Sequence, residues 1–123
     1  MKLRLLSTLI LSFAAFAGSA RAEPPAKMAN GMLIDSSGMT LYTFDKDTAG
    51  SGKSACNGPC ATLWPPAMAA AGAGTEGDFT IVARDDGSKQ WAFKGKPLYH
   101  YSVDKKAGDM MGDKFRDVWH VVK

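Results

Sequence analysis

The sequence has little of what marks most enzymes and nucleic-acid-binding proteins. It contains only two cysteines and two histidines, and it shows no His-Glu-x-x-His motif, Gly-rich phosphate loop or Ser/His/Asp order. After its first 22 residues it has no apolar run long enough to span a membrane. These absences favour a protein that is not an enzyme.

The first 22 residues have the pattern of a secretory signal peptide. Lys2 and Arg4 supply a positive start, Leu5–Ala17 is mainly apolar, and Ala20-Arg21-Ala22 places small residues where signal peptidase cleaves. A membrane anchor is the alternative interpretation, but this apolar stretch is too short to cross a bilayer as a helix. The sequence therefore predicts export.

The signal peptide accounts for the whole net charge. The chain has 15 basic and 12 acidic residues, and three of the basic ones fall before residue 23, which leaves 15 − 3 = 12 of each sign. No Lys/Arg cluster interleaved with aromatic residues follows, so the mature part lacks the charge pattern of a nucleic-acid-binding protein.

The remaining residues are enough for one small domain and show mostly β patterns. We expect strands at Met32–Ile34, Met39–Phe44, Phe79–Ala83, Gln90–Phe93, Leu98–Val103 and Asp117–Lys123. Helical periodicity is confined to one or two turns near Cys60–Trp64. The predicted fold is all-β or nearly so, a small antiparallel sheet domain.

Two segments of this domain match each other. Residues 38–47 (GMTLYTFDKD) align without a gap with residues 95–104 (GKPLYHYSVD), and a tryptophan follows in each half. Such order indicates an internal duplication. We expect a flexible arm at 23–30 and a single domain at 31–123, with repeats at about 31–66 and 79–123 joined by a linker at 67–78.

Both aligned segments fit the pattern Tyr-x-aromatic-x-x-Asp. With the Cys56-Asn-Gly-Pro-Cys60 segment and the tryptophans, they make the chain resemble a secreted repeat family of predicted lipoproteins that carries this motif, over residues 31–122. The resemblance implies an exported repeat protein without an agreed activity. Lipoproteins need a cysteine directly after the signal peptide, whereas Glu23 follows here. We therefore expect a soluble periplasmic or secreted protein without a lipid anchor.

The repeated motif residues have two interpretations. They form either an aromatic platform with aspartates that orient a ligand, or a core in which each aspartate closes a turn through local backbone hydrogen bonds. Duplication favours the core, because both repeats must build the same scaffold whereas one site needs only one copy. The set consists of Tyr42, Phe44, Asp47, Trp64, Tyr99, Tyr101, Asp104 and Trp119.

Cys56 and Cys60 enclose the turn sequence Asn57-Gly58-Pro59. In an oxidising compartment this favours a disulfide. Thiol oxidoreductases usually have two residues between their cysteines and a strand–helix pattern, whereas this chain has three in a β-rich context. Metal binding and redox catalysis remain as alternatives.

His100 and His120 are not required by the scaffold, because Thr43 and Pro65 align with them. Met110 and Met111 lie between them in sequence. Imidazole and thioether ligands suit copper, so these four residues are a candidate copper site. Ordinary surface residues are the alternative, because the spacing matches no metal motif.

The leading functional hypothesis is an exported, non-enzymatic module that binds a small ligand or an envelope protein. A copper-binding or envelope-stress protein is the alternative, and a thiol redox protein is third. Copper is the single cofactor under consideration.

Overall fold

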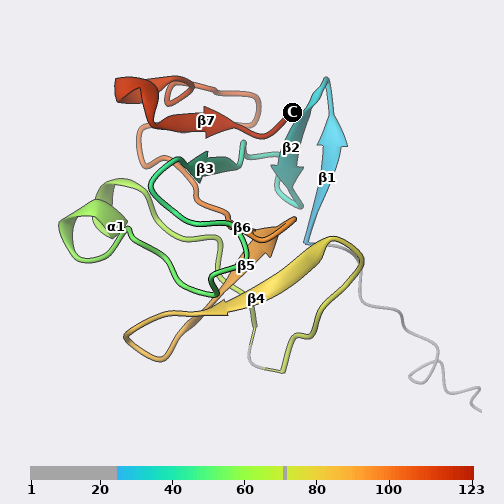
Figure 1. The fold of residues 1–123 in the computed structure, drawn as a ribbon. Coiled ribbons are helices and arrows are strands. Elements are labelled where there is room, and N and C mark those ends of the chain that lie inside the picture. Colours follow the sequence, from blue (N-terminus) through green and yellow to red (C-terminus); the bar gives the residue numbers. More distant parts are fainter. Residues whose placement is uncertain (1–24, 71) are drawn as a thin grey trace, which may run out of the picture.

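The computed structural model describes residues 25–70 and 72–123 (Figure 1), so the signal peptide expected at 1–22 lies outside the described residues. The elements are β1 (Ala26–Ala29), β2 (Met32–Asp35), β3 (Tyr42–Phe44), α1 (Pro59–Leu63), β4 (Phe79–Ala83), β5 (Lys89–Phe93), β6 (Lys96–Pro97), the 3-10 segment η2 (Phe115–Asp117) and β7 (Trp119–Val121). The strands form three small antiparallel sheets, ordered β1-β2, β3-β7 and β4-β5-β6. The prediction of a nearly all-β fold is confirmed.

Residues 26–29, expected within a flexible arm, instead form β1 and pair with β2. Asn30 and Gly31 connect the two strands with positive φ angles of 52° and 80°, the backbone that a two-residue hairpin turn requires. Ala26 is buried in the same apolar cluster as Leu33. The Asn-Gly pair was the sequence signal for this hairpin.

The short helix expected near Cys60–Trp64 is α1, at Pro59–Leu63. Pro59 stands at the start of the helix, where its missing N–H costs no hydrogen bond. The Trp64 N–H donates to the Cys60 carbonyl oxygen, and Pro65 and Pro66 then prevent another turn. Within residues 25–70 and 72–123, no helix is long and apolar enough to cross a membrane.

The strand expected at Leu98–Val103 is largely absent as a regular element. The β4-β5 hairpin forms as predicted, but β6 ends at Pro97, and Tyr99 then makes single bridges to Tyr42 and to Pro66. Because this stretch changes pairing partner within a few residues, it stays extended without building a continuous ladder. The start of the expected linker is also ordered, since Met68 bridges to Gln90 of β5.

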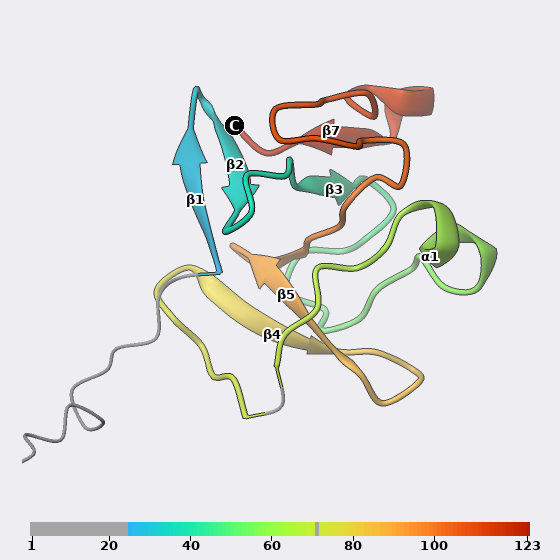
Figure 2. The same ribbon diagram turned by 180° about the vertical axis from the view of Figure 1, so that it is seen from behind.

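The two repeats are interleaved. Strand β3 of the first repeat pairs with β7 of the second, with Tyr42 opposite Val121, and both views show these strands side by side (Figures 1 and 2). Tyr42 and Tyr99 exchange backbone hydrogen bonds of 2.8 and 2.9 Å. The equivalent tyrosines of the two copies therefore meet at the centre of the fold.

Each aligned segment begins with a glycine that packs against the other repeat. A Cβ added at Gly95 would lie 2.8 Å from the backbone nitrogen of Gly50, and one at Gly38 would lie 3.0 Å from Cβ of Ala107. Both glycines also have positive φ, at 85° and 86°. Larger side chains at these two positions would separate the repeats.

The buried side chains form two apolar clusters. The first contains the repeated aromatic residues of both copies: Tyr42, Phe44, Cys56, Trp64, Tyr99, Tyr101, Trp119 and Val121. The second lies between the β1-β2 and β4-β5-β6 sheets: Ala26, Leu33, Leu41, Ala67, Phe79 and Leu98, with Trp91, Phe93 and Val122 packed against it. A pocket opens beside this second cluster.

Candidate functional site

The repeated tyrosines and aspartates form two hydrogen bonds that cross between the repeats. The Tyr42 hydroxyl donates to Oδ2 of Asp104 at 2.6 Å, and the Tyr99 hydroxyl donates to Oδ2 of Asp47 at 2.7 Å. All four side chains are buried. Each tyrosine is thus satisfied by the aspartate of the other copy.

The other oxygen of each aspartate accepts a hydrogen bond from a backbone N–H of the loop that follows it in its own repeat. Oδ1 of Asp47 accepts from the Ala55 N–H at 2.6 Å, and Oδ1 of Asp104 accepts from the Met111 N–H at 2.9 Å. These contacts within one repeat are half of the hydrogen bonding of each aspartate side chain. The cross-repeat half depends on tertiary pairing, which sequence spacing does not reveal.

Burial and the neighbouring aspartates both raise the pKa of Tyr42 and of Tyr99 far above the ordinary value of a phenol. Burial is the larger cause in each case, and the hydrogen bond to the aspartate is the second. Both phenols therefore stay protonated at physiological pH and act as permanent donors. This arrangement is suited to holding the repeats together.

Four of the motif aromatics form one continuous stack through the first cluster. Phe44 stacks on Trp119 with ring centroids 4.1 Å apart, Trp119 on Trp64 at 3.8 Å, and Trp64 on Tyr101 at 4.0 Å. These side chains are at most 8% exposed. The stack fills the core between the repeats and offers no open platform.

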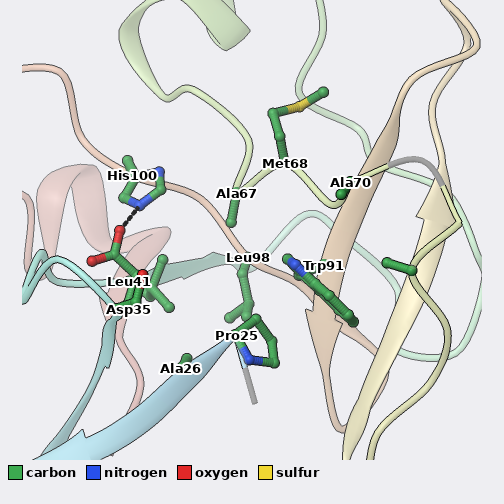
Figure 3. Close-up of a pocket in the computed structure, with 12 residues that line it drawn as sticks. Pro25, Ala26, Asp35, Leu41, Ala67, Met68, Ala70, Trp91, Leu98 and His100 are labelled. Carbon is green, nitrogen blue, oxygen red and sulfur yellow. Dashed lines mark hydrogen bonds and ion pairs between the residues drawn. The ribbon is translucent and has the colours of Figure 1, made fainter. Parts of the chain in front are cut away.

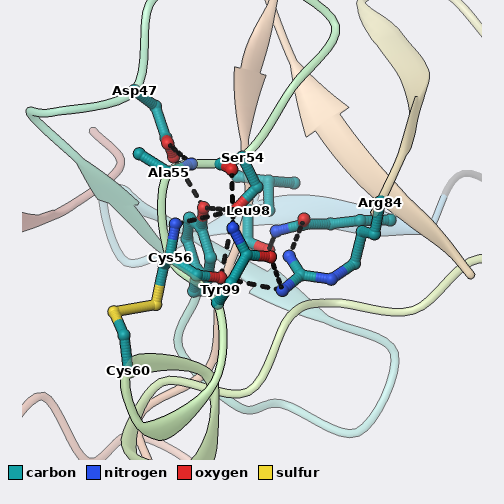
Figure 4. Close-up of a disulfide and its surroundings, with 10 residues drawn as sticks. Asp47, Ser54, Ala55, Cys56, Cys60, Arg84, Leu98 and Tyr99 are labelled. Atoms are coloured by element: carbon teal, nitrogen blue, oxygen red, sulfur yellow. Dashed lines mark hydrogen bonds between the residues drawn. A yellow bond between two sulfur atoms is a disulfide. The ribbon is translucent and has the colours of Figure 1, made fainter. Parts of the chain in front are cut away.

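Cys56 and Cys60 form the predicted disulfide (Figure 4). The buried guanidinium of Arg84 holds this loop, since Nη2 donates to the Cys56 carbonyl oxygen at 2.7 Å and to Oδ1 of Asn57 at 3.0 Å. Nη1 donates to Oε1 of Gln90 at 2.7 Å. All three acceptors are neutral oxygens, and no motif in the sequence pointed to this arginine.

Each of the two histidines is paired with a different aspartate. Nε2 of His100 lies 2.7 Å from Oδ2 of Asp35, and Nε2 of His120 lies 2.9 Å from Oδ2 of Asp45. Met110 and Met111 follow Asp109 and are exposed. In the described part of the chain, no group of three or more His, Cys, Asp or Glu side chains is placed to hold a metal ion. Copper binding at these four residues stays a prediction.

His100 lies at a pocket of about 350 Å³, hereafter the His100 pocket (Figure 3). Its lining residues come from β1, β2, β5 and the segments around them: Pro25, Ala26, Asp35, Ser36, Leu41, Ala67, Met68, Ala70, Ala73, Trp91, Leu98 and His100. The floor is apolar, because Leu41 and Leu98 are fully buried members of the second cluster. The Asp35–His100 pair forms the polar end.

The environment of Asp35 favours its ionised form. Burial raises the pKa of Asp35, but the hydrogen bonds from the Met39 N–H, from His100 and from the Ser37 N–H outweigh it, so that the pKa is lowered. The charged carboxylate accepts these bonds at 2.7–2.9 Å. Nε2 of His100 therefore carries the donated hydrogen, as inferred from this network, and Nδ1 has no hydrogen-bond partner among the described residues.

A family profile described as a secreted repeat of unknown function matches residues 26–68 and 80–123. The chain belongs to this family. The resemblance inferred from the repeated motif is thereby confirmed, and the two matched segments include both copies of that motif. Searches of curated proteins and of solved structures gave no match.

In this member of the secreted repeat family, sequence reasoning identified the aromatic residues of the core but not the pocket. Trp91 lies within the strand predicted at Gln90–Phe93, and the Asp35–His100 pairing joins positions 65 residues apart. The available signal was the departure from repeat symmetry, since His100 replaces the threonine of the first copy. In the structure this histidine faces a carboxylate and an apolar pocket.

Proposed function

We propose that this secreted repeat protein is an exported, non-enzymatic module that binds a small ligand in the His100 pocket. One observation carries the proposal: a pocket of about 350 Å³ with a mainly apolar lining and one hydrogen-bonded polar pair. Small-ligand sites typically have volumes of about 300–1,000 Å³ and combine apolar walls with few polar groups. The pocket meets both criteria.

The repeated motif supports a binding role at the pocket because its own hydrogen-bonded pairs are not available to a ligand. Its Tyr–Asp pairs are enclosed in the core and satisfied by each other, so they serve the scaffold. The disulfide supports the same view, because Cys56 is fully buried and its loop is held by Arg84. Thiol exchange requires an accessible sulfur. Of the two cysteines only the half-buried Cys60 can offer one, which makes the redox hypothesis the weaker one.

A titration of isotopically labelled mature protein with 2-methoxynaphthalene tests the proposal. This neutral probe is matched to the apolar floor, and amide and indole NMR signals locate where it binds. We expect saturable shifts centred on Trp91 and Leu98. If neither this probe nor 2-naphthol causes saturable shifts at the pocket, the proposed function is wrong.

Two matched variants sharpen this test. Ala70→Trp places a large ring among the pocket-lining residues, whereas Ala83→Trp places the same ring at the exposed end of strand β4, outside the pocket. We expect binding to be lost in the first variant and kept in the second. Equal binding by both would place the ligand elsewhere.

Export without lipid attachment is part of the same proposal. The family description as a secreted repeat supports export, and Glu23 after Ala22 supports an unmodified N-terminus. The intact mass of the exported protein is expected to correspond to residues 23–123. An increase of the size of an acyl chain would contradict this.

A further inference from the structure

The polar end of the His100 pocket has a defined hydrogen-bonding capacity. His100 keeps about 30% of its side chain exposed and uses Nε2 for Asp35. Nδ1 then accepts a hydrogen bond when the imidazole is neutral and donates one when it is protonated. A ligand hydroxyl both donates and accepts, so it pairs with Nδ1 in either state.

The charges around the pocket argue against a charged ligand. Among the described lining residues, Asp35 and His100 are the titratable ones. The Asp35 carboxylate already accepts three hydrogen bonds, two of them from backbone N–H groups, so it needs no cation from a ligand. The same negative charge disfavours a ligand carboxylate or phosphate beside it.

The rest of the pocket fits a flat apolar body. Leu41 and Leu98 form the floor, and Figure 3 shows the Trp91 ring beside Leu98, across the pocket from His100. Aromatic rings that pair in offset or edge-on geometry are stabilised beyond the area that they bury, so the indole favours an aromatic ligand. The ring and the imidazole thus lie at opposite ends of the same apolar floor.

We infer that the His100 pocket selects a neutral aromatic hydroxy compound, a phenol, whose hydroxyl forms a hydrogen bond with Nδ1 of His100 and whose ring lies against Trp91. This inference rests on the proposed function and adds the ligand class to it. The hydroxyl supplies selectivity, and the partly exposed lining side chains, such as Trp91 and Met68, supply contact area.

The test compares three probes of the same ring size on the unaltered mature protein at neutral pH. They are 2-naphthol, 2-methoxynaphthalene, which lacks the hydroxyl hydrogen, and 2-naphthoate, which is an anion. We expect 2-naphthol to bind about tenfold more tightly than the methoxy compound, the effect of one hydrogen bond at a partly buried site. 2-Naphthoate is expected to bind most weakly.

A matched pair of variants assigns the effect to the pocket histidine. His100→Thr introduces the residue that the first repeat has at the aligned position, while His120→Thr removes the other His–Asp pair, outside the pocket. We expect the preference for 2-naphthol to disappear in the first variant and to persist in the second.

The outcomes separate the inference from the proposed function. Equal affinities for 2-naphthol and 2-methoxynaphthalene in the unaltered protein, or tightest binding of 2-naphthoate, would overturn the inference and leave small-ligand binding in place. A preference that survives in His100→Thr would also overturn it. Failure of both neutral probes to bind would refute the function itself.

Discussion

Removal of one hydroxyl group from the core tests whether the cross-repeat hydrogen bonds hold the molecule together. Tyr42→Phe keeps the ring that packs edge-on against Trp64 at 5.3 Å. It removes the donor to Asp104 at 2.6 Å and the acceptor of the Gly112 N–H at 3.2 Å. Hydrogen bonds to charged groups contribute about 1.5–3 kcal/mol. The expected loss in the free energy of unfolding is therefore about 2 kcal/mol.

Urea denaturation followed by tryptophan fluorescence measures this loss, because the buried Trp64 and Trp119 report directly on the core. Tyr99→Phe is expected to cost a similar amount, since its hydroxyl has the equivalent role. Tyr101→Phe is the matched control: its hydroxyl has no hydrogen bond to the described residues, and its loss should change little. A cost below about 0.5 kcal/mol for Tyr42→Phe would refute the reasoning.

Larger truncations and alkaline pH extend the same prediction. Tyr42→Ala and Tyr99→Ala also remove a buried ring, so each should lower the free energy of unfolding by about 3–5 kcal/mol.

In the folded state the pKa of each phenol is raised, whereas the unfolded phenols titrate near 10.0. This contribution to stability is fully present below pH 10.0 and is lost as the pH rises further. Stability above that pH should fall less steeply in the Tyr42→Phe/Tyr99→Phe double variant.

Three further predictions concern packing, the disulfide and copper. Gly112→Ala should lower the free energy of unfolding by about 1–3 kcal/mol, measured by urea denaturation, because the new Cβ would lie 2.5 Å from Cη2 of Trp64. Replacing both cysteines by alanine should cost about 2 kcal/mol without unfolding the domain, since the loop is short; two free thiols in freshly isolated, denatured protein would contradict the disulfide. Calorimetry with Cu(I) and Cu(II) should show at most weak binding that the His100→Ala/His120→Ala variant loses, and no saturable heat at about 100 μM protein would end the copper hypothesis.

The gapless match of residues 38–47 to 95–104 was enough to predict the duplication and the shared role of the aromatic residues. The aromatic residues of each copy are buried together because residues two apart in a strand lie on the same face of the strand, here the face toward the core. The sequence could not show that Tyr42 bonds Asp104 of the other copy, because local spacing places Asp47 nearer along the chain. Cross-repeat pairing is decided by tertiary structure.

The predictions that differed from the structure have local explanations. Ala26–Ala29 follows two prolines and shows no strand alternation, so only the Asn30-Gly31 turn marked the hairpin. The extended stretch after Leu98 has strand alternation, but its partners change from one residue to the next. The polar end of the pocket joins Asp35 to His100, and neither the order nor the spacing of these residues indicates a pair.

The interleaving of the two repeats gives the molecule the interior of a two-fold dimer within one chain. Equivalent residues meet as they do at an isologous interface, with Tyr42 against Tyr99 and Trp64 against Trp119. The connecting segment then acts as a tether that sets the effective concentration of one copy near the other. If that segment were cut, folding would depend on protein concentration. A substitution in one member of a cross-repeat pair also removes a hydrogen bond or packing contact from its partner in the other copy. The two copies are therefore not free to diverge independently.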